Sequence, residues 1–557
     1  MSLFAETPPL IPFAEARAEA EPATVHMRDG VALHADVYLP AAAHRGRRVP
    51  TVLVRAPYGV REEYMMLPDI ARYVTERGMA AVLQDVRGKF RSGGAREPFL
   101  HEVADGYDTL EWITAQPWSD GRVGMYGESY YGFTQWAAAA SGHPALKAMA
   151  PIVTGSCLPS WHARPGVVPF FAAPVGWFAG SWNAESIFLR EEAEVLDFSV
   201  APVLDVLGPG FEHARALVSD LVVAPSADLI GRTYPQGPPA AQVSIPVLHR
   251  GGWWDNIKGS QLDDWHAVQQ SPARGSQFLE MAAMDHYSEP FSLTSATPAV
   301  EETTDDDVEL VAGSATQFLE HHLGVRVVAP RARVRAEIAN AGWVELDTWP
   351  PAAERTTWHL DDAGAAVASA DGGALRPLVP RRETTGSWAH DPGDLVPSLT
   401  VNDFHVLPQL PDESEVHARR DVATFTTDEL GADLDILGDV GAVLEVRASC
   451  PALPLIVALH HVRDRRATVI TEGSASAFVG SGWTTVHVDL GAVGYRVPRG
   501  DRIRISVSAS RFPRYLPPSG TVGSDWLARE RRPFDIKLRA GSASRVLLPL
   551  LEPGVAP

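Results

Sequence analysis

Short apolar segments alternate with segments of helical spacing in the first 153 residues, and this alternation limits the folds that the chain can adopt. The apolar segments 49–54, 79–83 and 146–153 are expected to be buried strands, and the segments 69–77 and 102–115 have the spacing of helices. Strands that alternate with helices form βαβ units with parallel strands. The sequence therefore predicts an α/β fold with a mostly parallel sheet, in which functional side chains gather at the carboxyl ends of the strands.

A serine stands between an expected strand and an expected helix, in the segment Gly-Glu-Ser-Tyr-Tyr-Gly that runs from Gly127 to Gly132. Such a sharp turn would present the hydroxyl of Ser129 at the carboxyl edge of the sheet, and the glycines would let strand and helix approach closely. The spacing is one residue longer than the common Gly-x-Ser-x-Gly turn. The alternative is a serine that only caps the helix, but the local context favours a nucleophile.

A nucleophilic serine needs a base to take its proton and a carboxylate to orient that base. Asp255 follows an apolar strand and a Gly-Gly turn, and His286 follows the next apolar strand. The chain order of serine, aspartate and histidine is that of the α/β-hydrolases. Asp255 could instead cap a helix, and a single histidine after a strand is usually structural, but the joint pattern favours a triad of Ser129, Asp255 and His286.

The oxyanion that forms on an attacked carbonyl needs hydrogen-bond donors that are already in place. One expected donor is the backbone N–H of Tyr130, which directly follows Ser129. The second should come from the loop after an early strand, and Tyr58 ends such a strand. The residues alone leave open whether Tyr58 is that donor or only a packing residue.

The strand and helix alternation is interrupted once and later ends. The part from 155 to 240 is rich in Pro, Trp and Phe and contains the expected helices 184–200 and 212–221, which suggests an inserted helical cap. After Pro330 many short strands follow one another with turn residues between them, a pattern that is typical of a β-sandwich or jelly roll. We expect these domains: an α/β-hydrolase domain over 1–154 and 241–350, a helical cap over 155–240, and a C-terminal jelly-roll β-sandwich over 351–557, with a connection around 350–380.

Composition disfavours several classes of partner. The 557 residues include 48 Lys and Arg against 69 Asp and Glu, and the resulting net charge of −21 disfavours nucleic acid and anionic membranes as partners. No segment approaches the ~18 consecutive apolar residues of a membrane-spanning helix, and the N-terminus lacks the pattern of a secretory signal. Cys157 and Cys450 lack metal-ligand spacing and are expected to be free thiols, although their state stays open. We expect a cytoplasmic protein.

Several motifs together resemble the CocE/NonD family of serine hydrolases, which contains bacterial cocaine esterase and is related to the X-prolyl dipeptidyl peptidases of family S15. The resemblance spans nearly the whole chain. It rests on Arg55 to Tyr58, Gln84 to Gly88 with Ser92 to Gly94, Gly127 to Gly132, Gly251 to Asp255, Trp343 to Pro350, Asp391 to Pro397, Arg420 to Phe425, Arg502 to Arg504 and Phe512 to Arg514.

The resemblance implies an α/β-hydrolase domain, a helical cap and a C-terminal jelly roll. It also implies that Ser129 is the nucleophile, that Asp255 and His286 complete the triad, and that the Tyr58 hydroxyl and the Tyr130 N–H form the oxyanion hole. One departure concerns specificity. The family usually carries Gly-Pro-Trp two residues before its histidine, where this chain has Ala282-Ala283-Met284, so an aromatic acyl specificity does not carry over directly. Further candidates for substrate contact are Trp254, Tyr131 and Met284.

The expected reaction is hydrolysis of an ester, or of an amide, through an acyl-enzyme, with no metal and no cofactor. An alternative is an X-Pro dipeptidyl peptidase or an α-amino-acid ester hydrolase, which needs carboxylates to hold a substrate ammonium. The glutamates between 185 and 194 could serve, but their spacing is more typical of a solvated helix face. A different class of function is binding of sugar or a partner by the jelly roll. A homodimer is implied only by the family.

Overall fold

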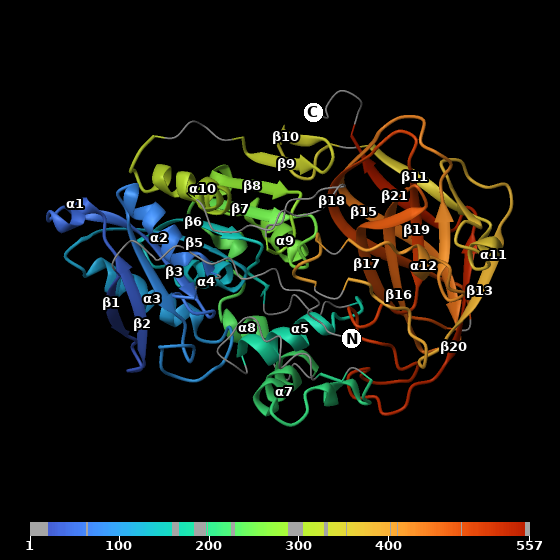
Figure 1. Ribbon diagram of the computed structural model, residues 1–557, viewed down its shortest axis with the longest axis horizontal. Helices are drawn as coiled ribbons and strands as arrows, with labels where there is room; N and C mark the ends of the chain where they lie inside the picture. Colours follow the sequence, from blue (N-terminus) through green and yellow to red (C-terminus); the bar gives the residue numbers. More distant parts are fainter. Residues whose placement is uncertain are drawn as a thin grey trace.

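The computed structural model describes residues 20–62, 65–158, 166–182, 196–197, 199–223, 229–287, 305–327, 332–352, 354–400, 403–408, 410–480 and 482–551. The helix expected over 184–200 falls almost entirely outside these residues. Figure 1 shows an α/β part, coloured blue to yellow, beside an all-β part, coloured yellow to red. Helical segments in teal and green, among them α5 and α7, lie below these two parts in this view.

The α/β part contains one sheet of ten strands, in the order β1-β2-β4-β3-β5-β6-β7-β8-β9-β10. The strands from β4 to β9 are parallel, and only the pairs at the two edges are antiparallel, so the predicted mostly parallel sheet is confirmed. The strands are β1 (Glu21–His26), β2 (Ala32–Tyr38), β3 (Val49–Ala56), β4 (Ala80–Asp85), β5 (Ser119–Glu128), β6 (Leu146–Ile152), β7 (Val247–Gly252), β8 (Gln277–Ala282), β9 (Val334–Ile338) and β10 (Gly342–Leu346).

Helices cover this sheet, which explains why β3 and β4 are buried along their whole length and are mostly apolar. Helices α3 and α4 pack on each other, α10 packs on α2, and α9 contacts β7 and β8. The helices are α1 (Ala41–His44), α2 (Leu67–Glu76), α3 (Glu102–Thr114), α4 (Ser129–Ala140), α9 (Lys258–Val268) and α10 (Asp305–His322), with a 3-10 turn η7 (Arg274–Ser276) before β8.

The segment between β6 and β7 contains several short helices in its described residues, as the sequence predicts. The helix expected over 212–221 is present as α7 and the π-helical turn that follows it. The elements are α5 (Ala172–Trp177), η3 (Phe178–Trp182), η4 (Val203–Val206), α7 (Glu212–Val218), η5 (Ser219–Val223), α8 (Leu229–Thr233) and η6 (Ala240–Gln242).

The C-terminal part is an all-β sandwich of mostly antiparallel strands, with one parallel pair, β12 with β14, among the described pairings. Strands such as β20 bury every second side chain, because one face packs inward and the other meets solvent. The elements are β11 (Glu354–Asp361), α11 (Ala363–Ala366), β12 (Gly373–Arg376), β13 (Thr384–His390), α12 (Ser414–His417), β14 (Ala423–Thr426), β15 (Leu434–Ala448), β16 (Ala452–Arg463), β17 (Arg466–Phe478), β18 (Thr484–Val497), β19 (Arg502–Ser508), β20 (Phe534–Ala540) and β21 (Arg545–Leu550).

The stretch around 350–380 was expected to be a connection, and that prediction is wrong for most of its length. It contains β11, α11 and β12, and β12 pairs with both β11 and β14. Gly373, the first residue of β12, lies so close to the neighbouring strand that an added Cβ would meet the backbone oxygen of Thr424 at 2.4 Å. A strand that is short and begins with glycine gives no alternating apolar pattern, which explains why the sequence did not reveal it.

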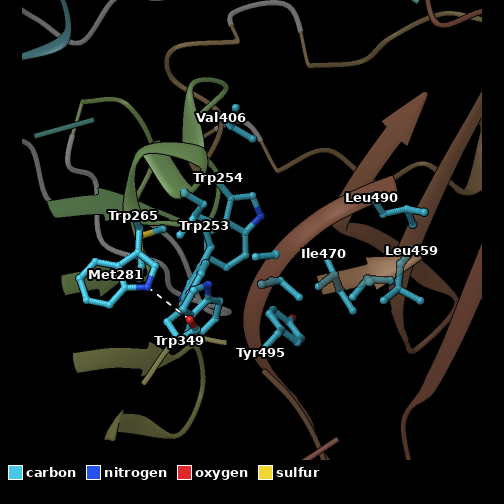
Figure 2. Packing of buried hydrophobic residues seen from close by; sticks show 14 of the residues in the cluster. Trp253, Trp254, Trp265, Met281, Trp349, Val406, Leu459, Ile470, Leu490 and Tyr495 are labelled. Atoms are coloured by element: carbon cyan, nitrogen blue, oxygen red, sulfur yellow. Dashed lines mark hydrogen bonds between the residues drawn. The ribbon is translucent and has the colours of Figure 1, made fainter. Parts of the chain in front are cut away.

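The two parts share one hydrophobic core. Figure 2 shows tryptophans of the α/β part facing Tyr495, which belongs to β18 of the sandwich. The rings of Trp254 and Tyr495 lie edge to face at 6.2 Å, and those of Trp253 and Trp349 lie 5.4 Å apart. The indole N–H of Trp253 donates to the carbonyl of Glu337 at 2.6 Å. The sandwich therefore supports the loop after β7.

Candidate active site

Ser129 lies in the turn between β5 and α4, with a backbone φ of +50°. A non-glycine residue in this left-handed region is strained and persists only where its surroundings fix it. The surroundings are tight: a Cβ on Gly127 would lie 2.2 Å from the ring of Tyr131, and one on Gly132 would lie 2.5 Å from Cγ2 of Thr154. The Thr154 hydroxyl also donates to the Ser129 carbonyl at 2.6 Å. The sequence therefore builds a turn that holds the serine at the end of its strand.

Asp255 and His286 follow the ends of β7 and β8, the next strands of the sheet beyond β6. His286 Nδ1 lies 2.8 Å from Asp255 Oδ1, and both side chains are buried. Asp255 Oδ1 also accepts the backbone N–H of Ile257 at 3.1 Å. Because an ionised carboxylate can only accept, His286 donates from Nδ1 and keeps the lone pair of Nε2 for another proton. This is the state that a general base needs.

The hydroxyl of Tyr58 lies beside Ser129, in the loop after β3. It accepts the indole N–H of Trp177 at 3.3 Å and also makes hydrogen bonds with the Ser129 hydroxyl and the Tyr130 backbone N–H. Burial raises the pKa of Tyr58 above the ordinary value, and these hydrogen bonds only partly oppose the rise. The phenol of Tyr58 therefore keeps its proton and is able to donate a hydrogen bond. The sequence alone had left open whether Tyr58 is a donor or only a packing residue.

The loop that carries Tyr58 is held by Asp85, at the end of β4. One carboxylate oxygen accepts the backbone N–H of Val60 at 3.0 Å, and the other pairs with Arg91 at 2.9 Å. Arg91 also contacts the buried carboxylate of Asp36 at 3.1 Å. The motif from Gln84 to Gly88 thus has a local structural role next to the site.

A small cavity of about 10 Å³, roughly the space that one water needs, opens beside Ser129. Its walls come from distant parts of the chain, and they are mostly aromatic or aliphatic. The lining residues are Tyr58, Phe99, Ser129, Tyr130, Leu158, Trp177, Ile257 and Phe404. No carboxylate is among these eight residues of the described structure. The described surface next to the serine is therefore mostly apolar and carries no negative charge.

Phe404 belongs to the segment 403–408 of the all-β part, and its ring lies 5.0 Å from the imidazole of His286. No sequence pattern indicated Phe99, Leu158, Ile257 or Phe404, since only the tertiary fold brings them to the serine. Trp177 was visible only as one member of an aromatic-rich cap.

The three further candidates for substrate contact are not among the residues that line the cavity. Trp254 packs against Tyr495, and Tyr131 lies edge-on to Tyr58 at 6.3 Å between ring centroids. Met284 is buried, and its carbonyl accepts the backbone N–H of Trp254.

One group in the described part of the chain brings metal-ligand atoms together, in the all-β part: Glu413, His417 and His460. His460 Nε2 contacts Glu413 Oε2 at 2.9 Å and His417 Nε2 at 3.3 Å. Arg504, which can only donate, faces His417 Nδ1 at 3.2 Å, so His417 carries its proton on Nε2. Arg511 also pairs with Glu413, so two guanidinium groups face these three residues, and their positive charge opposes the binding of a cation. Among the described helices, none is long and apolar enough to cross a membrane.

A serine in a strand–turn–helix, with an aspartate and a histidine bonded to each other at two later strand ends, is the arrangement of an α/β-hydrolase. Comparisons with known proteins agree. Residues 29–287 match the model of the X-Pro dipeptidyl-peptidase (S15 family), and residues 326–533 match the X-Pro dipeptidyl-peptidase C-terminal non-catalytic domain. Cocaine esterase of Rhodococcus sp. (strain MB1 Bresler) is 30% identical, over 91% of this chain and 93% of that protein. The chain belongs to the CocE/NonD family of serine hydrolases.

Two solved structures share the fold over 98% of both chains. An aminopeptidase from a marine sediment Thaumarchaeota archaeon superposes with a TM-score of 0.77 at 18% identity. An α-amino acid ester hydrolase superposes with a TM-score of 0.76 at 21% identity. At these identities the likeness shows the fold alone.

Proposed function

We propose that this chain is a serine esterase that cleaves esters of apolar acyl groups through an acyl-enzyme. In this proposal Ser129 is the nucleophile, His286 is the general base and acid, and Asp255 orients the imidazole. The Tyr58 hydroxyl and the Tyr130 backbone N–H form the oxyanion hole.

The contacts in the site support a two-step acyl transfer. His286 Nε2 takes the hydroxyl proton as Ser129 Oγ attacks the ester carbonyl, and the two oxyanion donors stabilise the negative oxygen. The imidazolium then protonates the leaving alcohol as the bond from the acyl carbon to the alcohol oxygen breaks. Water attacks the acyl-enzyme in the same way, which releases the carboxylic acid and restores the Ser129 hydroxyl.

The observation that carries the ester assignment is the lining of the cavity beside Ser129. Its described residues are apolar, aromatic or hydroxylic, and include no carboxylate. An aminopeptidase or an α-amino-acid ester hydrolase must hold a charged ammonium beside the scissile carbonyl, and an unpaired charge in an apolar wall is costly. An uncharged acyl group carries no such cost. The Rhodococcus relative is likewise named an esterase.

Hydrolysis of a matched panel tests the proposal. The panel contains p-nitrophenyl acetate, butyrate, octanoate and benzoate, together with Ala-Pro and alanyl p-nitroanilides, and wild type is compared with Ser129→Ala. We expect ester turnover that Ser129→Ala abolishes, with no release from the two amino-terminal substrates. Release only from substrates with a free amino group would replace the esterase by a peptidase. Equal activity of wild type and Ser129→Ala would overturn the assignment of the nucleophile.

A further inference from the structure

The phenol of Tyr130 makes buried polar contacts that the proposed hydrolysis steps do not use. Its oxygen accepts the backbone N–H of Phe99 at 2.8 Å and donates to Glu102 Oε1 at 3.0 Å. Tyr130 is fully buried and Glu102 is 3% exposed. The residue whose backbone N–H is proposed to bind the oxyanion is therefore held through its side chain as well as through helix α4.

The second oxygen of Glu102 continues this chain of contacts. Oε2 accepts from the guanidinium of Arg55 at 2.8 Å, and the side chain of Arg55 is fully buried. Arg55 in turn donates from Nε to the side-chain oxygen of Gln84 at 2.7 Å. A buried ion pair is tolerated when its two groups are well placed and hydrogen-bonded. Removal of either group strongly destabilises the protein, because the other charge then stays buried and unpaired. The carboxylate of Glu102 is thus fixed at both oxygens.

Arg55 connects these contacts to the strand that precedes Tyr58. Arg55 lies in β3, three residues before Tyr58. The contacts from Tyr130 through Glu102 to Arg55 therefore join the turn after β5 to the strand that leads to the second proposed oxyanion donor. One set of bonds therefore connects the two backbone segments that carry the proposed donors.

The same phenol also holds part of the cavity wall. Phe99 has a φ of +73°, in the strained left-handed region, and its N–H is the group that Tyr130 accepts. Its ring stacks on Tyr130 at 5.3 Å and on Trp177 at 5.8 Å between centroids. The hydrogen bond to the Tyr130 hydroxyl thus holds Phe99, a strained residue of the cavity wall next to Ser129.

We propose that Glu102 and Arg55 are positioning residues of the oxyanion hole and act through the phenol of Tyr130. Oxyanion donors accelerate the reaction only when they point at the place where the charge develops, and a misplacement of ~1 Å can cost about 100-fold in rate. The inference rests on the proposed function, because it takes the Tyr130 N–H as one of the donors.

Tyr130→Phe is the sharpest test, because it leaves the backbone N–H in place and removes only the hydroxyl. We expect kcat for p-nitrophenyl butyrate to fall about tenfold while KM changes less than twofold. Affinity for a propyl trifluoromethyl ketone, which forms a tetrahedral adduct with the serine, should fall by the same factor as kcat/KM. Glu102→Gln should also lower kcat, because an amide has a single accepting oxygen and cannot accept from both Tyr130 and Arg55.

Tyr234→Phe is the matched control. Tyr234 is buried too, but its hydroxyl has no hydrogen-bond partner among the described residues, so this variant should keep the wild-type kcat. Wild-type kcat and ketone affinity in both Tyr130→Phe and Glu102→Gln would overturn the inference, as would a rise of KM with unchanged kcat. If Tyr130→Phe does not fold, Glu102→Gln decides by the same two readouts. An active Ser129→Ala would instead overturn the proposed function.

Discussion

The ring of Phe404 packs against the imidazole of His286 with 5.0 Å between centroids, although the two residues come from different parts of the fold. Phe404 also lines the cavity beside Ser129. Its segment is tied to the α/β part by Asp285, whose carboxylate accepts the backbone N–H of Leu407 at 3.0 Å. The all-β part therefore contributes a wall to the candidate active site in addition to its role in packing.

Phe404→Ala should widen the cavity on the side of His286. We expect the ratio of kcat/KM for the benzoate to that for the acetate to rise about tenfold, because the space once filled by the ring becomes available to a larger acyl group. The control is Phe478→Ala, which removes a ring of the same part that is 89% exposed. An unchanged ratio in Phe404→Ala would mean that the acyl group lies elsewhere.

Asp255→Asn should lower kcat by about 10³- to 10⁴-fold with little change in KM. An asparagine can donate to His286 Nδ1, which moves the imidazole proton to Nε2 and leaves no lone pair to accept from Ser129. Steady-state kinetics on p-nitrophenyl butyrate checks this loss. Asp421→Asn, which removes a carboxylate paired with Arg419 in the all-β part, should behave as wild type. A loss below tenfold in Asp255→Asn would contradict the orienting role.

Tyr58→Phe should reduce kcat by about 10²- to 10³-fold, the usual effect of removing one oxyanion donor. The structure also gives a pH dependence. Burial raises the pKa of Tyr58, so the neutral donor form persists above pH 10, where an ordinary tyrosine would lose its proton. In wild-type kcat measured from pH 8 to pH 10.5 on a stable ester, any fall caused by this group should be centred above pH 10. A decline centred near pH 10 with the protein still folded would count against the assignment.

His249 makes stability depend on pH in a defined direction. Burial lowers the pKa of this imidazole to about 4, and the contact with Gln277 only partly opposes the shift. Between this pKa and the ordinary value of 6.5, His249 is protonated in the unfolded chain but not in the native state. Its contribution to the free energy of unfolding is therefore complete above pH 6.5 and is lost as the pH falls toward 4. When the pH falls from 7.5 to 5, this group alone lowers the free energy of unfolding by about 2 kcal/mol. The drop in Tm over that interval should be smaller in His249→Gln than in wild type, and an equal drop would contradict the argument.

The α/β sheet could be predicted because its strands are short, apolar and separated by helical periods. The predicted helix over 102–115 is present as α3, and the predicted strand over 146–153 is present as β6. Chain order and strand ends also pointed to Asp255 and His286, which the fold brings to 2.8 Å. These features are local or follow from the order of strands in one sheet.

The cavity could not be predicted, because its walls depend on contacts between distant segments. Phe404 lies in a loop without periodic pattern, and its place next to His286 follows from how the sandwich docks on the α/β part. The hydrogen bonds that run from Tyr130 through Glu102 to Arg55 could not be predicted from the sequence either. Glu102 looks like an ordinary acidic residue at a helix start, and only the fold shows that it is buried between Tyr130 and Arg55.

Covalent labelling tests the central claim, that Ser129 is the nucleophile, most directly. The protein is treated with a diisopropyl fluorophosphate, and the adduct is located by peptide mass mapping while the remaining esterase activity is followed. We predict one adduct per chain, on Ser129, that forms in proportion to the loss of activity and is absent from Ser129→Ala. An adduct on another residue that accompanies inactivation, or full activity in the labelled protein, would contradict the account.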